Sequence, residues 1–235
     1  MAFWGQYVSV AERRAKAKRE MNKLRKKGLV VRPVEISGRA IAKSFWGKGW
    51  CQHLESFSDY SNRLPRGRTY ARNGSVCHLE IAEGLVKAMV AGSSLYEVEV
   101  EIGALPDSVW TEVKKKCGGQ IGSMLELLQG KFSKEVMTVV ADRSKGLFPK
   151  PKEIKLSCSC PDWATMCKHV AAVLYGVGNR LDNEPELLFT LRGVKAEELI
   201  AADLIFAADS GEDQLPDEQL ADIFGIDLEF DFEEE

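Results

Sequence analysis

The chain has 235 residues, of which 45% are hydrophobic and 29% charged, with a formal net charge of −3. This composition is ordinary for a globular protein, and the length is sufficient for a hydrophobic core in one large domain or two small ones. No apolar run approaches the roughly 18–20 residues of a membrane span. Positive charges follow the first apolar residues instead of preceding them, so we expect no signal peptide and a cytoplasmic location.

Charge is distributed very unevenly along the chain. Residues 1–72 hold 17 Lys and Arg against 5 Asp and Glu, whereas residues 182–235 hold 2 basic and 18 acidic residues. The first segment therefore carries +12 and the last −16. A basic segment attracts polyanions such as nucleic acid, and an acidic tail attracts basic partners. The alternative is mutual attraction between the two segments combined with solubility.

Residues 1–33 open with Trp4 and Tyr7 and continue as a lysine- and arginine-rich stretch of good helix formers from Ser9 to Lys27. Gly28 is a typical stop signal. Apolar residues are too sparse for a strong core face, so we predict a solvated basic helix or a mobile arm. Such a helix binds phosphates in some proteins and is merely a soluble face in others.

Residues 34–103 are typical of an α+β unit. Ser44 is a good cap for a helix whose aromatic and aliphatic residues fall on one stripe, which favours core over a ligand pocket. Turn signals then separate alternating segments, of which 96–102 is the clearest. We predict strands near 68–73, 76–82, 85–91 and 96–102, forming an antiparallel meander packed on this helix.

The second half of the chain is predicted to be mainly helical. Helices are expected over 106–116, 120–128, 170–175, 184–191 and 195–208, with a short strand over 154–156 that leads into Cys158. Residues 131–152 give no clear signal, and 145–152 form a basic, proline-containing connector. From Asp209 the chain is acidic, and 228–233 alternate acidic and apolar residues, a pattern typical of a docking segment or of a solvated tail.

The strongest motif is the twelve-residue segment 158–169, which holds three of the six cysteines. Cys158 and Cys160 are one residue apart, and Cys167 and His169 repeat that spacing six residues later. Three thiolates and one imidazole make a full tetrahedral set for zinc and leave no open position for a reactive water. We therefore expect a structural zinc site, whose binding stabilises small modules by roughly 10–16 kcal/mol.

Three thiolates around one divalent cation leave a charge of −1, which Lys155 and Lys168 are placed to offset. Six cysteines are too few and too unevenly placed for a disulfide framework, which favours a reduced compartment and a metal.

Other potential ligands are better explained by packing. Cys51 and His53 lie two apart in a predicted helix, and so point about 200° away from each other. Cys77 and His78 are adjacent on a predicted strand and face opposite sides. Cys117 is isolated in the sequence. Asp162, beside the cysteines, is of a residue type common in turns, and we interpret it as a turn residue and not as a catalytic carboxylate.

The pattern Cys158-x-Cys160, six residues, Cys167-x-His169, followed by an apolar helix, resembles the SWIM zinc finger. A weaker likeness to stand-alone bacterial SWIM proteins covers most of the chain, through the aromatic and glycine-rich segment 45–50 and the segment 187–193. The resemblance implies that Cys158, Cys160, Cys167 and His169 bind one zinc ion. It also implies roles in DNA and protein binding, beside helicase-like ATPases.

The expected fold class is α+β: a small antiparallel sheet with packed helices, followed by a helical region containing a compact zinc finger. The expected units are a basic arm (1–33), an α+β domain (34–103), a helical connector (104–152), the finger with its following helices (153–208) and an acidic tail (209–235).

The sequence offers little for catalysis. It has no phosphate-binding loop, no nucleophile elbow and only three histidines. We therefore expect a non-catalytic, zinc-stabilised adaptor that contacts nucleic acid through its basic N-terminal third and a helicase-like ATPase through its acidic tail. The alternatives are a purely protein-interaction component without nucleic-acid contact, and a metal-dependent hydrolase.

Overall fold

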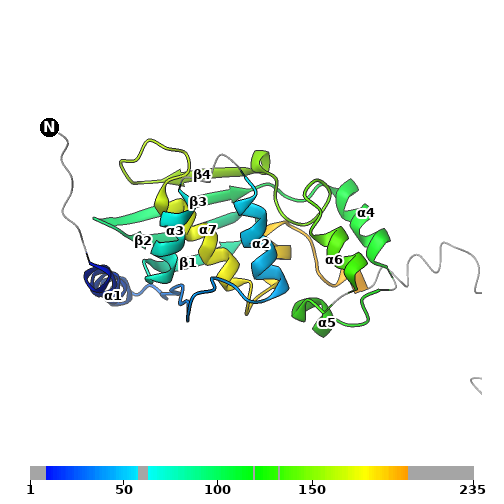
Figure 1. Ribbon diagram of the computed structural model, residues 1–235, viewed down its shortest axis with the longest axis horizontal. Coiled ribbons are helices and arrows are strands. Elements are labelled where there is room, and N and C mark those ends of the chain that lie inside the picture. The colour runs from blue at the N-terminus through cyan, green and yellow to red at the C-terminus, as the bar shows by residue number, and fades with distance from the viewer. Residues whose placement is uncertain (1–8, 58–62, 119, 132, 201–235) are drawn as a thin grey trace, which may run out of the picture.

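The computed structural model describes residues 9–57, 63–118, 120–131 and 133–200. Within them the chain forms a four-stranded antiparallel sheet with helices packed over one of its faces (Figure 1). The predicted α+β class is confirmed. A single large core joins residues between Val34 and Leu199.

The sheet has the order β1-β2-β3-β4, and each strand is antiparallel to its neighbour. Its strands are β1 (Val76–Ala82), β2 (Leu85–Ala91), β3 (Leu95–Ile102) and β4 (Ile154–Cys158). The bounds of β1, β2 and β3 agree to within one residue with the predicted strands 76–82, 85–91 and 96–102. Strict alternation in β3 buries one face and exposes its glutamates on the other. β4 pairs with β3 from Ile102↔Ile154 to Val98↔Cys158, so the cysteine segment starts on this sheet.

The predicted strand near 68–73 is wrong, because these residues belong to helix α3 (Leu64–Arg72). Its buried residues are Leu64, Gly67 and Ala71, whose spacings of three and four are those of a helical stripe. A Cβ on Gly67 would lie 2.3 Å from Cβ of Ala171 in helix α7 (Lys168–Arg180), so α3 and α7 approach closely enough at this point to leave no room for a side chain. The stripe is short and contains only one large apolar side chain, which explains why periodicity did not reveal it.

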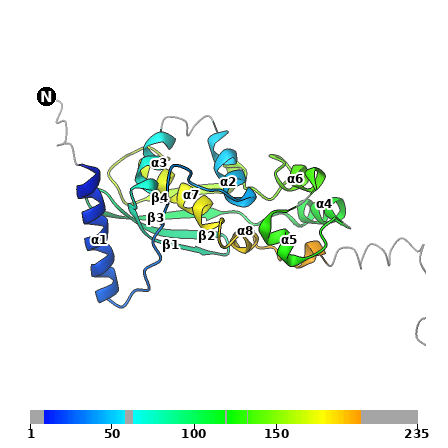
Figure 2. The same ribbon diagram turned by 60° about the horizontal axis from the view of Figure 1, so that its bottom comes forward.

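Helix α7 (Lys168–Arg180) is the central helix of the covering layer, and it confirms the apolar helix predicted behind the cysteine segment (Figure 2). All residues from His169 to Gly178 are buried, since α7 lies between the sheet and helices α2 and α3. Helix α2 (Phe45–Glu55) begins at the predicted cap Ser44, whose side chain accepts the N–H of Gly47 at 3.0 Å.

The aromatic stripe of α2 is core, as predicted. Trp46 and Trp50 are buried, and their indole N–H groups donate to the carbonyl oxygens of Leu127 (3.0 Å) and Leu174 (2.8 Å). Both indole donors are thus satisfied, and α2 is fixed to α7 on one side and to helix α5 (Met124–Gln129) on the other.

Helix α1 (Val10–Lys26) confirms the predicted basic helix, and Ser9 and Glu12 form a capping box at its start. It stands at the left end of the molecule in Figure 2, against β1 and β2. Ala17 and Leu24 are buried, while most of its lysines and arginines are exposed. A narrow stripe that contains Ala17 and Leu24, and not a broad apolar face, therefore packs this helix against β1 and β2.

The other end of the molecule consists of short helices. These are α4 (Asp107–Cys117), α5 (Met124–Gln129), α6 (Lys134–Val140), the 3-10 turn Pro151–Glu153 and α8 (Glu186–Leu191). Helices α4, α5 and α8 correspond to predictions over 106–116, 120–128 and 184–191, whereas α6 lies in the stretch without a predicted structure.

Some predictions fall outside the described residues. They concern Trp4 and Tyr7, the acidic tail 209–235, and residues 201–208 of the helix predicted over 195–208. In the described part of that predicted helix, residues 198–200 are helical. Among the helices of the described part, none is long and apolar enough to cross a membrane.

Candidate metal centre

The structure brings the four predicted ligands together at one end of the sheet. Cys158, Cys160, Cys167 and His169 each place one ligand atom within 4.8 Å of the other three. Nδ1 of His169 lies 3.9 Å from Sγ of Cys158 and 3.8 Å from Sγ of Cys167. A tetrahedral zinc with bonds of about 2.3 Å to sulfur and about 2.0 Å to nitrogen separates such atoms by about 3.5 Å. The cluster is therefore consistent with one zinc ion after a slight contraction.

Two elements of regular structure position these side chains. Cys158 ends β4, and the strand pairing continues through Ser159, whose N–H donates to the carbonyl of Glu97 at 3.0 Å. The Ser159 hydroxyl accepts the N–H of Glu97, also at 3.0 Å. Cys167 is the N-cap of α7, and His169 lies in its first turn. One ligand pair thus comes from a sheet edge and the other from a helix start.

The N-terminus of α7 favours the thiolate form of Cys167. A hydrogen bond with the Cys158 thiol lowers the pKa of Cys167, and the ring of His169 and the N–H of Val170 at 3.4 Å act in the same direction against burial. The same bond raises the pKa of Cys158, so Cys167 is the first thiol of this pair to ionise. Zinc binds thiolates, and these contacts favour ionisation of one of the proposed ligands.

The imidazole of His169 is oriented by aromatic walls. The Tyr96 ring lies 4.5 Å from it at a tilt of 31°, and the Tyr70 ring meets it edge-on at 5.5 Å. A Cβ on Gly92 would lie 2.8 Å from Nε2, so the absence of a side chain there makes room for the ring. Nε2 is buried without a hydrogen-bond partner in the described part of the chain. This leaves Nδ1, which faces the thiols, as the ligand atom.

The predicted role of Lys155 in offsetting the charge of the site is wrong. Lys155 lies on the solvent face of β4, opposite Glu101, and its ammonium pairs with that carboxylate at 3.3 Å. Because side chains alternate along a strand, Lys155 and Cys158 point to opposite faces. Lys168 directly follows Cys167, and its ammonium stands 5.7 Å over the ring of Tyr70. Of the two predicted cations, Lys168 therefore stands over a ring that packs against His169, whereas Lys155 pairs with Glu101.

The loop between the ligand pairs is a turn, as the sequence indicates. The Asp162 carboxylate accepts the N–H of Ala164 at 3.2 Å and pairs with Arg63 at 3.5 Å. Asp162 therefore joins the loop to the start of α3.

The other cysteines and histidines lie apart from the cluster. His53 Nε2 contacts the carbonyl of Pro149 at 2.9 Å, and His78 Nδ1 accepts the N–H of Arg32 at 3.2 Å. Burial raises the pKa of Cys51 to about 12 and those of Cys77 and Cys117 to about 11, so these thiols stay protonated near neutrality. They are packing residues, as predicted.

Sequence reasoning missed Tyr70, Gly92 and Tyr96 as components of the site. Tyr70 lies in the wrongly predicted strand 68–73, and Gly92 lies in the turn between the predicted strands 85–91 and 96–102. The inward position of Tyr96 on an alternating strand was visible, but nothing in the pattern joined it to His169.

The donor set and its geometry are thus consistent with a Cys3His zinc-finger centre. Residues 139–177 match the SWIM zinc finger family, and the chain therefore contains a SWIM zinc finger domain. The match extends from α6 to near the end of α7, and includes all four residues of the cluster.

The chain is also a homologue of the uncharacterized protein Rv2102 of Mycobacterium tuberculosis. The two are 37% identical over 179 residues, which are 72% of this chain and 64% of the relative. The chain thus covers less than two thirds of that relative's length. No solved structure matches the chain.

Proposed function

We propose that the chain is a non-catalytic binding module whose zinc centre holds a nucleic-acid-binding surface in place. The observation that supports this most directly is Trp163, which lies in the loop between the ligand pairs and is 94% exposed. Exposing a tryptophan to this extent is unfavourable for a free surface, and a stacking partner such as an unpaired base offsets that cost.

Three cations contact either this loop or the Tyr70 ring that packs against His169. Arg63, at the N-cap of α3, is fixed to the loop by its ion pair with Asp162. Lys168 of α7 and Arg13 of α1 both stand over the ring of Tyr70, at 5.7 and 5.9 Å. An exposed aromatic residue among cations is the pattern by which proteins hold single-stranded nucleic acid.

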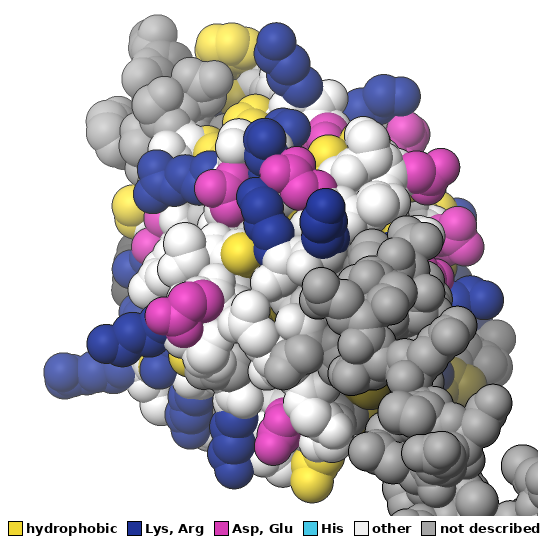
Figure 3. Space-filling model, turned by 90° about the vertical axis from the view of Figure 1, so that its right-hand side faces the viewer, with side chains coloured by type: hydrophobic (Ala, Val, Ile, Leu, Met, Phe, Trp, Pro, Cys, Tyr) yellow, Lys and Arg dark blue, Asp and Glu magenta, His cyan; other side chains and the backbone are white. Residues whose placement is uncertain are grey.

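The opposite end of the molecule has a different surface. Around α4 and α6, cationic and anionic side chains are interspersed (Figure 3). Several pair with each other there, as Lys116 and Lys145 do with Glu112. Residues 107–145 carry 7 Lys and Arg against 5 Asp and Glu, a small excess of positive charge. We place the proposed interface at the finger end, because Trp163 is exposed there.

The role of zinc in this proposal is structural. Cys158, Cys160, Cys167 and His169 supply four ligands, which fill a tetrahedral coordination sphere and leave no position for substrate. The ion would tie the edge of the sheet to the start of α7, and so fix the loop that carries Trp163.

The test is binding of a fluorescent single-stranded oligonucleotide to the zinc-loaded chain at several salt concentrations. We expect affinity to fall steeply with salt, and Trp163→Ala to weaken binding by about 1–3 kcal/mol through loss of stacking. Leu125→Ala removes an apolar side chain that is 65% exposed at the opposite end and serves as the control. Absence of salt-sensitive binding to any DNA or RNA would contradict this proposal.

The second candidate function is a protein-interaction component without nucleic-acid contact. The segregation of +12 in residues 1–72 and −16 in residues 182–235 favours it, because an acidic tail suits docking to a basic partner such as a helicase-like ATPase. Deleting residues 210–235 should abolish capture of that partner and leave zinc content unchanged. Persistence of every partner after the deletion would exclude the tail as the docking element.

A further inference from the structure

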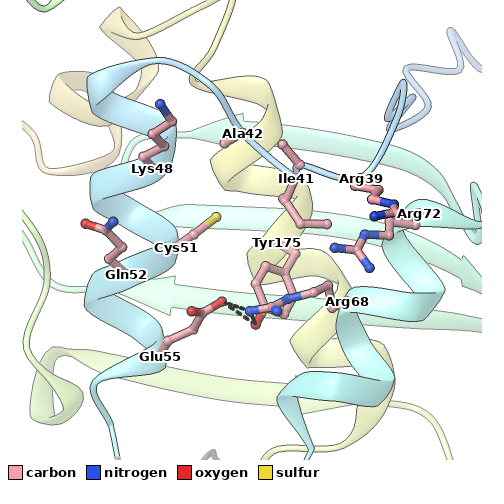
Figure 4. Close-up of a pocket in the computed structure, with 11 residues that line it drawn as sticks. Arg39, Ile41, Ala42, Lys48, Cys51, Gln52, Glu55, Arg68, Arg72 and Tyr175 are labelled. Carbon is pink, nitrogen blue, oxygen red and sulfur yellow. Dashed lines mark hydrogen bonds and ion pairs between the residues drawn. The ribbon is translucent and has the colours of Figure 1, made fainter.

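We propose that a cationic pocket between α2 and α3 binds a phosphate group. The pocket has a volume of about 210 Å³ and is lined by Arg39, Lys48, Glu55, Arg68, Arg72 and Tyr175 among others (Figure 4). Three of these cations come from separate elements: Arg39 from the chain before α2, Lys48 from α2 and Arg72 from α3. The pocket is distinct from the cysteine cluster and shares none of its residues.

Among the described residues, the lining has four cations and one carboxylate, and that carboxylate is already paired. Glu55 accepts a hydrogen bond from the Tyr175 hydroxyl at 2.8 Å and pairs with Arg68. The side chains of Arg39, Lys48 and Arg72 have no hydrogen bond or ion pair with any described residue, and Nε of Arg72 is buried without an acceptor among those residues. The pocket therefore holds positive charge and hydrogen-bond donors that no residue of the described ranges satisfies.

An anion is the ligand that satisfies both deficits. Like charges held at one pocket repel each other, and a buried donor without an acceptor costs free energy. The planar guanidinium group presents a fork of N–H donors that matches phosphate oxygens, and two arginines at one pocket favour a multiply charged tetrahedral anion. Figure 4 shows Arg72 reaching from α3 into the space beside Tyr175.

The size of the pocket limits what enters it. About 210 Å³ is below the roughly 300–1,000 Å³ of pockets that enclose whole drug-sized ligands. Arg39, Lys48 and Gln52 at its rim are exposed to solvent. We infer that the pocket takes the phosphate group itself, while the rest of a phosphorylated ligand lies outside.

The walls of the pocket are fixed before any ligand arrives. The segment after Arg39 is anchored to the end of α7, because Asn179 donates to the carbonyl of Ile41 at 3.0 Å. Asp182 accepts the N–H groups of Lys43 at 2.7 Å and Ser44 at 2.9 Å. Arg72 stands on α3, which touches α7 through Gly67. Such preorganisation reduces the entropy lost when an anion binds.

The experiment measures phosphate binding by the full zinc-loaded chain in a phosphate-free buffer. Inorganic phosphate is titrated while the melting temperature and the binding heat are recorded, for the wild type and for the pair Arg39→Gln with Arg72→Gln. The control pair, Arg143→Gln with Lys134→Gln, removes the same charge from exposed positions outside the pocket. Arg72→Lys keeps the charge and removes the fork.

We expect phosphate to raise the melting temperature of the wild type and of the control pair but not that of the pocket pair. Affinity should fall about tenfold or more in the pocket pair, the loss expected for removing hydrogen bonds to a charged group. A marked loss of phosphate affinity in Arg72→Lys indicates that the planar guanidinium group, and not net charge alone, recognises phosphate. An equal response of the wild type, the pocket pair and the control pair to phosphate would overturn the proposal.

A second arm identifies the source of the phosphate. Loss of oligonucleotide affinity in the pocket pair, beyond that in the control pair, assigns the pocket to a nucleic-acid backbone. Loss of phosphate affinity alone assigns it to a small phosphorylated molecule. The phosphate arm uses no nucleic acid, so it stands even where Trp163→Ala shows that the proposed function is wrong.

Discussion

At the scale of single residues, the zinc centre depends on side chains far from the cysteine motif. His169 contacts Tyr70, Gly92 and Tyr96, which belong to α3, the β2–β3 turn and β3. Metal-binding histidines usually donate their second ring N–H to an acceptor that fixes the ring. In this site, aromatic walls and a missing side chain fix the ring instead.

Gly92→Ala should therefore weaken zinc binding without touching a ligand. The new methyl group would lie 2.8 Å from Nε2 of His169 and 2.8 Å from the Tyr96 ring, so the imidazole must tilt. We expect a loss of about 10–100-fold in zinc affinity, as for other residues that orient a ligand. Competition with a chelator measures it. Gly103→Ala, whose new atom meets its nearest neighbour at 3.6 Å, is the control and should leave affinity unchanged.

Cys167→Ala should abolish stable zinc binding. Cys167 is both a proposed ligand and the N-cap of α7, so its loss removes a thiolate and the acceptor for the N–H of Val170. Elemental analysis should give one zinc per wild-type chain and almost none in this variant. Cys117→Ala removes an equally buried thiol outside the cluster and should retain the metal. One full equivalent of tightly held zinc in Cys167→Ala would contradict the ligand assignment.

The ligand set was predictable because it is local in sequence. Two Cys-x-Cys/His pairs six residues apart reveal their chemistry without knowledge of the fold. The surroundings were not predictable, because Tyr70, Gly92 and Tyr96 reach His169 only through the packing of α3 and the sheet on α7. Lys155 is a second example. It is only three residues from Cys158 in sequence, but side chains alternate along β4, so Lys155 faces the opposite side of the sheet.

At the scale of elements, strands with alternating patterns were predictable and short helices were not. In β3, glutamates alternate with apolar residues, so one face had to be buried and the other solvated. Helix α3 has a buried stripe of Leu64, Gly67 and Ala71, and two of these three residues contribute little apolar area. Its helical state depends on close contact with α7, which no local pattern encodes.

Gly67→Val tests this contact. The new side chain would begin 2.3 Å from Cβ of Ala171, so α3 has to move away from α7. Overpacking of this kind costs about 1–3 kcal/mol, and we expect the free energy of unfolding in urea to fall by that amount. Thr69→Ala, on the exposed side of α3, should change it by less than about 0.5 kcal/mol. Equal stabilities of the two variants would show that α3 is not held by this contact.

At the scale of the whole molecule, α7 connects the two proposed sites. Its first turn carries His169 and its cap is Cys167, while Tyr175 lines the cationic pocket two turns further on. Helix α3 packs along α7, with Tyr70 against His169 and Arg68 beside Tyr175. Zinc at one end would thus stabilise the helix pair that shapes the pocket at the other.

The charge of the whole molecule should also affect oligonucleotide binding, and truncation of the acidic tail tests this effect. Residues 210–235 hold 11 acidic residues and no basic one, so removing them changes the formal net charge from −3 to +8. Because like charge repels a polyanion, we expect the shortened chain to bind a single-stranded oligonucleotide more tightly at low salt. The two affinities should converge near 1 M salt, where the Debye length is about 3 Å.

A full-length variant with its tail Asp and Glu residues changed to Asn and Gln separates charge from chain length. It should match the truncated chain at every salt concentration if charge is the cause. Fluorescence anisotropy with the zinc-loaded proteins measures all three affinities. Equal affinities of the wild type and the truncated chain at low salt would show that the tail does not act on the nucleic-acid surface. The tail's excess of negative charge would then serve a partner protein, which is the second candidate function.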